Sequence, residues 1–187
     1  RMSTLDHLTQ GRAGWNIVTG YLDSAARAMG QTQQIPHDRR YDMADEYLDV
    51  LYQLWEGSWQ EDALLADRQN RIYADSTKIH SIQHHGEFFD VEGYHLTSPS
   101  PQRTPLLYQA GSSKRGIQFA ARHAECTFVN GATPQAMKAQ VNTLRQAAVA
   151  AGRRADSLKV FMGVGVIVAK TEAEAKEKNH EYLRYAS

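Results

Sequence analysis

The sequence predicts an α/β protein with parallel strands. Short apolar runs alternate with amphipathic segments, in the order strand, helix, insertion, strand, helix, strand, helix, strand, helix. One apolar run, residues 106–110, breaks at Gly111-Ser112-Ser113 (the Gly-Ser-Ser turn) and continues as a helix. A strand, a glycine turn and hydroxyls at a helix start favour phosphate binding, although an ordinary capped helix start has the same pattern. The pattern leaves open a doubly wound sheet or a barrel.

The composition is that of an ordinary globular protein. The chain has 187 residues, 42% hydrophobic and 22% charged, which predicts one domain over 1–187. Lys+Arg and Asp+Glu both number 21, so we expect small-molecule partners rather than nucleic acid. The single cysteine, Cys126, predicts a buried thiol in a reducing cytoplasm. No apolar run reaches the ~20 residues of a membrane span, so we expect no membrane partner.

The first sixty residues predict helices on either side of a strand. Residues 1–10 have helical spacing before Gly11, and a second helical patch covers 24–29. The β-branched run 15–19 predicts a strand buried on both faces. The clearest helix runs from 36 to 55, with Asp38 as its N-cap. We expect its four acids to face water rather than a metal ion; they are Asp42, Asp45, Glu46 and Asp49.

Residues 57–104 predict an insertion within the domain. Residues 62–76 show little periodicity, whereas 86–96 predict a hairpin that turns near Glu92-Gly93. A connection of about fifty residues between buried strands is long enough to expect a functional role. The histidines of this segment lack zinc-ligand spacing, so no metal is expected.

The second half predicts two further strand and helix pairs after the Gly-Ser-Ser turn. A helix over 113–123 precedes a buried strand at 126–129. Pro134 begins a helix that ends at Gly152. A β-rich run over 158–169 leads to a final helix over 171–185, with Thr171 as its cap.

Six motifs carry a family resemblance over essentially the whole chain. They are GWNIVT at 14–19, HDRRYD at 37–42, LWEGSW at 54–59, GEFF at 86–89, SPQRTP at 100–105 and QAGSS at 109–113. In this order they resemble the bacterial-luciferase-like flavin-dependent monooxygenases. The most similar branch contains nitrilotriacetate, dibenzothiophene-sulfone and long-chain alkane monooxygenases.

The resemblance implies a TIM (β/α)8 barrel, of which this chain is a middle fragment covering about strands 4 to 7. The segment 57–104 then corresponds to the family's long insertion. A complete barrel has eight strands and typically about 250 residues, so we expect further sequence at both ends. The family also implies a homo-oligomer.

The activity implied is that of a two-component FMN-dependent monooxygenase. A separate flavin reductase supplies reduced FMN, O₂ adds at the flavin C4a position, and the peroxide oxygenates a small organic substrate. Two other classes stay open: a deazaflavin-dependent oxidoreductase on the same fold, and a non-catalytic flavin-binding relative or inactive fragment. The substrate is not predicted.

The resemblance also implies a set of cofactor-binding residues. They are Asn16, Thr19, Tyr41, Gly111, Ser112 and Ser113. The Gly-Ser-Ser turn and the Tyr41 hydroxyl are expected to hold the FMN phosphate, while Asn16 and Thr19 face the isoalloxazine ring. Tyr41 as a half-buried helix aromatic and Asn16 as a satisfied buried amide are the simpler interpretations. No catalytic base is assigned, because Gly20 stands where some relatives carry serine or histidine.

Overall fold

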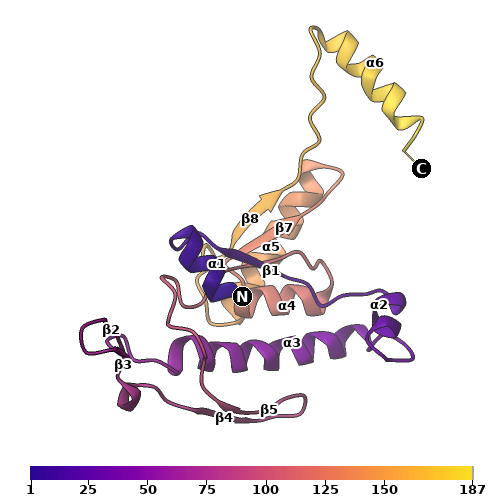
Figure 1. Cartoon of the computed structure of the whole chain (residues 1–187). Coiled ribbons are helices and arrows are strands. Elements are labelled where there is room, and N and C mark those ends of the chain that lie inside the picture. The colour runs from indigo at the N-terminus through magenta and orange to yellow at the C-terminus, as the bar shows by residue number, and fades with distance from the viewer. Residues whose placement is uncertain (187) are drawn as a thin grey trace.

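The computed structural model describes residues 1–186 and is organised around a four-stranded parallel sheet. The strands pair in the order β1 (Gly14–Ile17), β6 (Leu106–Gln109), β7 (Cys126–Val129) and β8 (Lys159–Met162). Three helices cover one face of the sheet: α3 (His37–Tyr52), α4 (Lys114–His123) and α5 (Pro134–Ala150) (Figure 1). The predicted parallel α/β class is confirmed.

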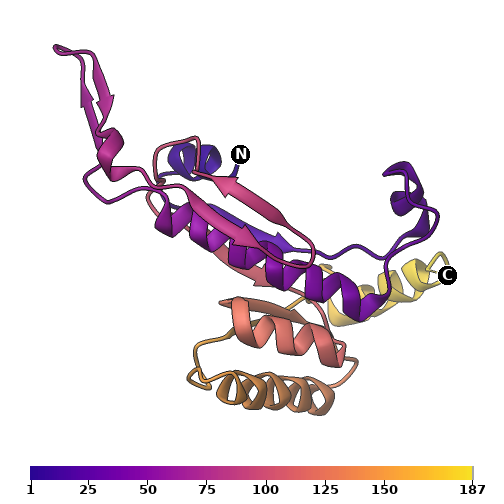
Figure 2. The same ribbon diagram turned by 90° about the horizontal axis from the view of Figure 1, so that it is seen from below.

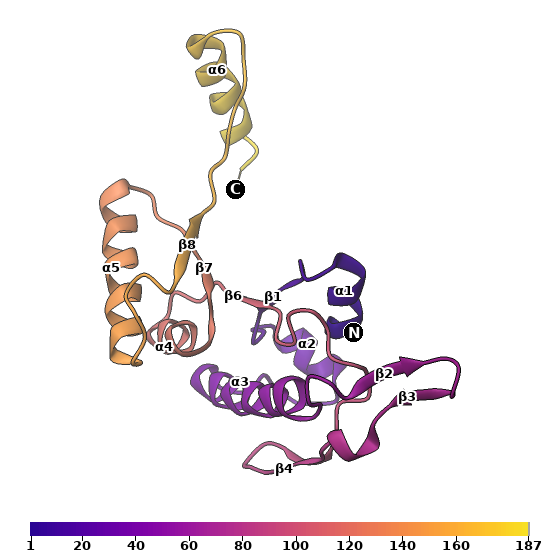
Figure 3. The ribbon, with the colours of Figure 1, turned by 90° about the vertical axis from the view of Figure 1, so that its left-hand side faces the viewer.

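The core consists of two clusters on the helix-covered face. The first lies between β1, β6, α3 and α4 and contains Ile17, Tyr41, Leu48, Leu107 and Phe119. The second lies between β7, α4 and α5 and contains Ala120, Ala124, Val129, Leu144 and Leu158. Helix α4 contributes to both clusters and lies between α3 and α5 (Figure 3). Its position therefore depends on contacts with both neighbours.

The opposite face of the sheet carries an aromatic ladder of Tyr108, Phe128 and Phe161. The ring centroids of Tyr108 and Phe128 are 5.9 Å apart, and those of Phe128 and Phe161 are 5.7 Å apart. Phe128 and Phe161 remain 42% and 43% exposed. Asn16, opposite Tyr108 in the register, is also exposed, whereas Ile17 points to the helices. The prediction of strands buried on both faces is therefore wrong, because alternate side chains leave the helix-covered side.

The N-cap of helix α3 lies two residues before the predicted cap. Pro36 occupies the N-cap position, and Asp38 lies in the first turn, where it contacts Nδ1 of His37 at 2.6 Å. The prediction of Asp38 as the N-cap is wrong, although an acid in the first turn still favours the helix dipole. At its other end α3 continues into a π-helical turn, η1 (Gln53–Gly57).

Two antiparallel hairpins lie between η1 and β6. The first pairs β2 (Leu64–Asp67) with β3 (Ile72–Ala74), and the second pairs β4 (Ile82–His85) with β5 (Asp90–Gly93). A 3₁₀ turn, η2 (Ser76–Lys78), separates them. Figure 2 shows β4 and β5 alongside α3, with the first hairpin projecting beyond it. The first hairpin was not predicted.

The second hairpin turns earlier than predicted. Its turn spans 86–89, and Glu92 and Gly93 pair within β5 instead. The cause is tertiary, because the Glu46 carboxylate on α3 accepts the N–H groups of all three residues after Gly86. The donor–acceptor distances are 3.1 Å from Glu87, 3.0 Å from Phe88 and 2.8 Å from Phe89.

The remaining helices occur where the sequence predicts them. They are α1 (Met2–Thr9), α2 (Asp23–Ala28) and α6 (Glu172–Leu183), and Thr171 caps α6 by accepting the N–H of Glu174 at 3.3 Å. The predicted strand over 158–169 is shorter: β8 ends at Met162, opposite Val129, where its partner β7 also ends. Residues 163–169 lead away from the sheet to α6 (Figure 1). No helix within residues 1–186 is long and apolar enough to cross a membrane.

Candidate functional site

The Gly-Ser-Ser turn lies directly after β6, at the carboxyl end of the sheet. Ser113 is the N-cap of α4, and its Oγ accepts the N–H of Gly116 at 3.0 Å. The simpler interpretation of the turn as a capped helix start is therefore realised. This cap leaves the hydroxyl proton of Ser113 available, because an oxygen that accepts from Gly116 still has its own proton to donate.

The first turn of α4 has backbone donors to spare. Within residues 1–186, the N–H groups of Ser112, Ser113, Lys114 and Arg115 make no hydrogen bond to the protein. Such groups at a helix start attract an anion. The first turn contains no acid that would compete for them. The turn can therefore accept a phosphate without displacing a protein carboxylate.

Tyr41 approaches the same turn from α3. Its ring is 6% exposed and packs on Phe119, with ring centroids 5.5 Å apart. Its Oη accepts from Nε2 of Gln109 at 3.2 Å. A Cβ atom at Gly111 would lie 2.5 Å from this oxygen, and one at Gly116 would lie 2.8 Å from it. Tyr41 is thus fully buried rather than half-buried, and glycine at both positions leaves room for its hydroxyl.

Gln109 is a member of the site that sequence reasoning missed. It is 3% exposed, and while its Nε2 donates to Tyr41, its Oε1 accepts the N–H of Gly111 at 2.7 Å. The available signal was a polar residue at the end of an apolar strand, immediately before the turn. Because the N–H of Gly111 is already bonded, Gly111 contributes space to the site rather than a donor.

Ser112 faces a polar hollow between the ends of β6 and β7. The cavity has a volume of about 210 Å³, and Gly111, Ser112, Thr127, Asn130 and Gln140 are among its lining residues. Nε2 of Gln140 donates to the backbone oxygen of Asn130 at 2.7 Å and so ties α5 to the loop after β7. Asn130 and Gln140 are further polar groups that the sequence analysis did not identify.

Asn16 and Thr19 lie apart from the Gly-Ser-Ser turn. Asn16 is on the aromatic-ladder side of β1, opposite Tyr108. Thr19 lines a separate, mainly apolar cavity of about 410 Å³, together with residues that include Trp15, Met43 and Phe89. The structure therefore brings together four of the six predicted residues around the turn and places the other two at the end of the neighbouring strand.

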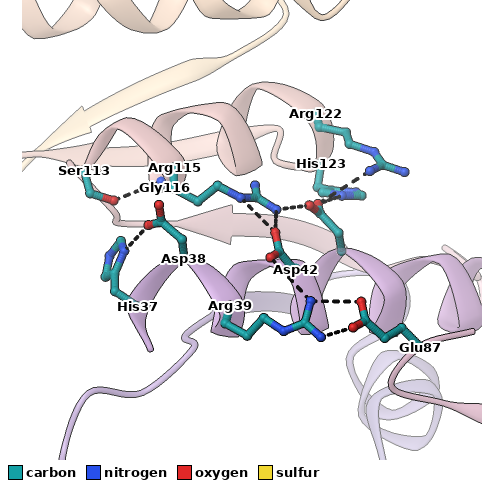
Figure 4. A network of polar contacts seen from close by, with 11 residues as sticks. His37, Asp38, Arg39, Asp42, Glu87, Ser113, Arg115, Gly116, Arg122 and His123 are labelled. Carbon is teal, nitrogen blue, oxygen red and sulfur yellow. Dashed lines mark hydrogen bonds and ion pairs between the residues drawn. The ribbon is translucent and has the colours of Figure 1, made fainter. Parts of the chain in front are cut away.

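Helix α4 is joined to α3 by a network of ion pairs (Figure 4). Nη2 of Arg115 lies 2.9 Å from Oδ1 of Asp42 and also pairs with Asp45. Nε2 of His123 lies 2.7 Å from Oδ1 of Asp45. The prediction that the α3 acids face water is wrong for Asp45 and Glu46, whose side chains are 16% and 15% exposed. Their partners lie far away in the sequence, so helical periodicity could not identify them.

Cys126 lies in β7 and is 4% exposed, which confirms the predicted buried thiol. Burial raises its pKa above the ordinary value, so the thiol stays protonated at neutral pH. Residues 1–186 contain no group of three or more His, Cys, Asp and Glu side chains that could hold a metal ion.

These features define a class of protein: a parallel α/β fold in which a helix start with free backbone donors, able to accept an anion, lies at the carboxyl edge of the sheet. The family model described as luciferase-like monooxygenase matches residues 1–187. The chain belongs to this family, as the motifs predict.

Characterised relatives are similar over the whole chain. The chain is 52% identical over 187 residues to a long-chain alkane monooxygenase of Geobacillus thermodenitrificans, covering 100% of this chain and 42% of the relative. It is 48% identical to a dimethyl-sulfide monooxygenase of Hyphomicrobium sulfonivorans, covering 100% and 39%. The chain thus spans about two fifths of the length of these relatives.

Solved structures of similar proteins superpose on this chain over nearly its whole length. A long-chain alkane monooxygenase superposes with a TM-score of 0.92 at 52% identity, covering 100% of this chain and 43% of the other. A riboflavin lyase solved with modified FMN and riboflavin superposes with a TM-score of 0.90 at 49% identity, covering 96% and 40%.

Proposed function

We propose that this chain forms the FMN-phosphate side of the active site of a two-component flavin-dependent monooxygenase. In this proposal a separate reductase supplies reduced FMN, and the substrates are O₂ and a small organic molecule. The four strands are then consecutive strands, about 4 to 7, of a TIM barrel. Support comes from the monooxygenase relatives and from a riboflavin lyase, 49% identical, that was solved with modified FMN.

The observation that carries the proposal is the donor set around the Gly-Ser-Ser turn. The oxygens of Tyr41 and Ser113 each accept a hydrogen bond from the protein, so their protons remain available. Ser112 adds an exposed hydroxyl, and the first turn of α4 adds unpaired N–H groups. A phosphate dianion offers only acceptors and carries the charge that a helix start favours. The residues present therefore fit this group.

Bound reduced FMN would supply the activation of O₂, and the protein would bind, orient and exclude water. Asn16 and Thr19 are assigned to the isoalloxazine side because both lie at the carboxyl end of β1, next to β6. The exposed rings of the aromatic ladder lie on the same face as Asn16 and offer an apolar surface for the rest of the cofactor pocket.

A deazaflavin is the alternative cofactor. It has less support, because the deazaflavin-dependent relative is less similar to this chain than the monooxygenases are. An F420-dependent secondary alcohol dehydrogenase superposes with a TM-score of 0.63 at 19% identity, a likeness that concerns the fold alone. By contrast, a dibenzothiophene-sulfone monooxygenase of Rhodococcus erythropolis is 41% identical over 181 residues.

Thermal unfolding of the full-length protein tests the choice of cofactor. A ligand that binds only the folded state raises the midpoint, by an amount set by its concentration relative to its Kd. We expect FMN at a fixed concentration to raise the midpoint more than riboflavin or a deazaflavin cofactor does. A larger shift with the deazaflavin would replace this proposal by the alternative, and no shift with any of them would contradict flavin binding.

A further inference from the structure

Asp45 contacts both ends of α4. Its carboxylate pairs with Arg115, in the first turn of the helix, and accepts from Nε2 of His123, the last residue, at 2.7 Å. The two partners are eight residues apart, or about 12 Å along a helix axis. A single carboxylate therefore restrains both the rotation and the sliding of α4 against α3.

The His123 end of this contact includes a tyrosine hydroxyl. Nδ1 of His123 lies 3.0 Å from the hydroxyl oxygen of Tyr52. Burial raises the pKa of Tyr52 to about 12, so the tyrosine keeps its proton at neutral pH. An ionised carboxylate can only accept, so Nε2 of His123 donates to Asp45. The carboxylate of Asp45 is the acceptor that completes this buried chain.

The Arg115 end adjoins the proposed phosphate site. Tyr41 and Asp45 are one turn apart on α3, and Arg115 and Gly116 are adjacent on α4. The Arg115 guanidinium carbon lies 5.8 Å from the centre of the Tyr41 ring. The ion pair and the contact between Tyr41 and Gly116 are thus parts of one interface. Movement of α4 would displace the donors of its first turn from the Tyr41 hydroxyl.

Burial by itself would raise the pKa of Asp45, but the hydrogen bonds from His123 and Arg115 outweigh this effect and hold the pKa below its ordinary value. The carboxylate is therefore charged at neutral pH. Together with Asp42 it neutralises Arg115 and holds the guanidinium towards α3.

We propose that Asp45 is a positioning residue for phosphate binding, which acts by fixing the start of α4 against Tyr41. The inference rests on the proposed function and concerns FMN binding rather than chemistry. Removal of the Asp45 charge should weaken the part of the affinity that depends on the phosphate. Riboflavin lacks that phosphate, so its affinity should change little.

Asp49 provides a matched control. It lies one turn further along α3 and pairs with Arg122 of α4 at 3.2 Å, but both side chains are about half exposed, 43% and 54%. An exposed pair of this kind contributes little to helix position. Asp49→Asn makes the same chemical change on the same helix and keeps the contacts of Asp45 with Arg115 and His123; Arg122 then retains its longer contact with Asp45, at 3.8 Å.

The experiment measures Kd for FMN and for riboflavin in the full-length protein by quenching of flavin fluorescence. For Asp45→Asn we expect the Kd for FMN to rise about fivefold or more relative to the Kd for riboflavin, a typical coupling between two sites. Asp49→Asn should leave the ratio unchanged. Loss of fold alone would weaken both ligands equally and would not change the ratio.

A second variant covers the case in which Asp45→Asn does not fold. Asp42→Asn removes the more exposed partner of Arg115 and leaves His123 untouched, and we expect a smaller shift in the same direction. An unchanged or increased preference for FMN in the folded variants would overturn the role of Asp45. A wild-type protein without preference for FMN over riboflavin would instead overturn the proposed phosphate site, and the inference with it.

Discussion

The hydroxyl oxygen of Tyr41 lies where a methyl group on Gly111 would have to be, since a Cβ atom built there falls 2.5 Å from it. This contact joins α3 to the turn between β6 and α4, across seventy residues of sequence. It requires both the tyrosine and the glycine. The predictions below concern this contact and the carboxylates of Asp6 and Glu46, which hold two loops by accepting hydrogen bonds from them.

Gly116→Ala should destabilise the protein, although alanine is about 1 kcal/mol better than glycine inside a helix. The new Cβ would lie 2.8 Å from Tyr41 Oη and 3.1 Å from the Cα of Gly111. Overpacking of this kind costs about 1–3 kcal/mol. Urea unfolding should show a net loss of up to about 2 kcal/mol. Tyr41→Phe in the same chain should relieve part of it, and strictly additive effects would contradict the contact.

Tyr41→Phe should lower the affinity for FMN more than that for riboflavin. The substitution keeps the buried ring but removes the hydroxyl that we assign to the phosphate. It also leaves Nε2 of Gln109 without its acceptor, which costs about 1–3 kcal/mol of stability. Titration with both flavins and a thermal melt measure the two effects separately. An unchanged ratio of the two affinities would remove Tyr41 from the phosphate site.

Asp6→Asn should destabilise the protein at neutral pH and flatten its acid sensitivity. Asp6 is 1% exposed and accepts the N–H of Gln102 at 2.9 Å and its Nε2 at 2.6 Å. Burial alone would raise the pKa of Asp6, but the hydrogen bonds from Gln102 and Ala13 lower it below the ordinary value. Loss of a charged acceptor costs about 2 kcal/mol.

A carboxyl with a lowered pKa stabilises the folded state above its unfolded pKa of about 4 and loses this contribution as the pH falls through the folded value. Urea unfolding at pH 7 and at successively lower pH below about 4 should therefore show a larger decrease for the wild type than for Asp6→Asn. Parallel curves would contradict the role of this carboxylate.

Glu46→Gln should loosen the turn of the second hairpin. The carboxylate accepts the N–H groups of 87–89, and a glutamine side chain presents an NH₂ group to one or more of these donors. Hydrogen exchange at these amides should become roughly tenfold faster, because hydrogen bonds to a charged group are the stronger ones. Glu87→Gln is the control, since within residues 1–186 that side chain forms its ion pair with Arg39, at the surface.

Helix positions were largely predictable because they depend on neighbours in the sequence. The spacing of apolar residues in α3 and α5, Pro134 at a helix start, and the caps Ser113 and Thr171 all act within one turn of the chain. The first hairpin was missed because its short strands, Leu64–Asp67 and Ile72–Ala74, are largely exposed and lack a regular alternation of apolar residues.

The candidate site was only partly predictable. Family motifs pointed to Tyr41 and the Gly-Ser-Ser turn, and the structure places them in contact. Gln109 begins the motif QAGSS, but the motif by itself assigns the glutamine no role, because its two partners become visible only in the fold. Helical periodicity placed Asp45 in water, since its partners Arg115 and His123 lie seventy or more residues further along the chain.

The sequence by itself determined the alternation of strands and helices, the capped start of α4 and the family to which the chain belongs. Periodicity, capping and motifs are carried by residues close together in the chain. Only the tertiary structure decided which face of the sheet is covered, where the second hairpin turns, and which acids are buried. These depend on groups such as Glu46 and the hairpin amides, about forty residues apart, and packing alone brings them within hydrogen-bonding distance.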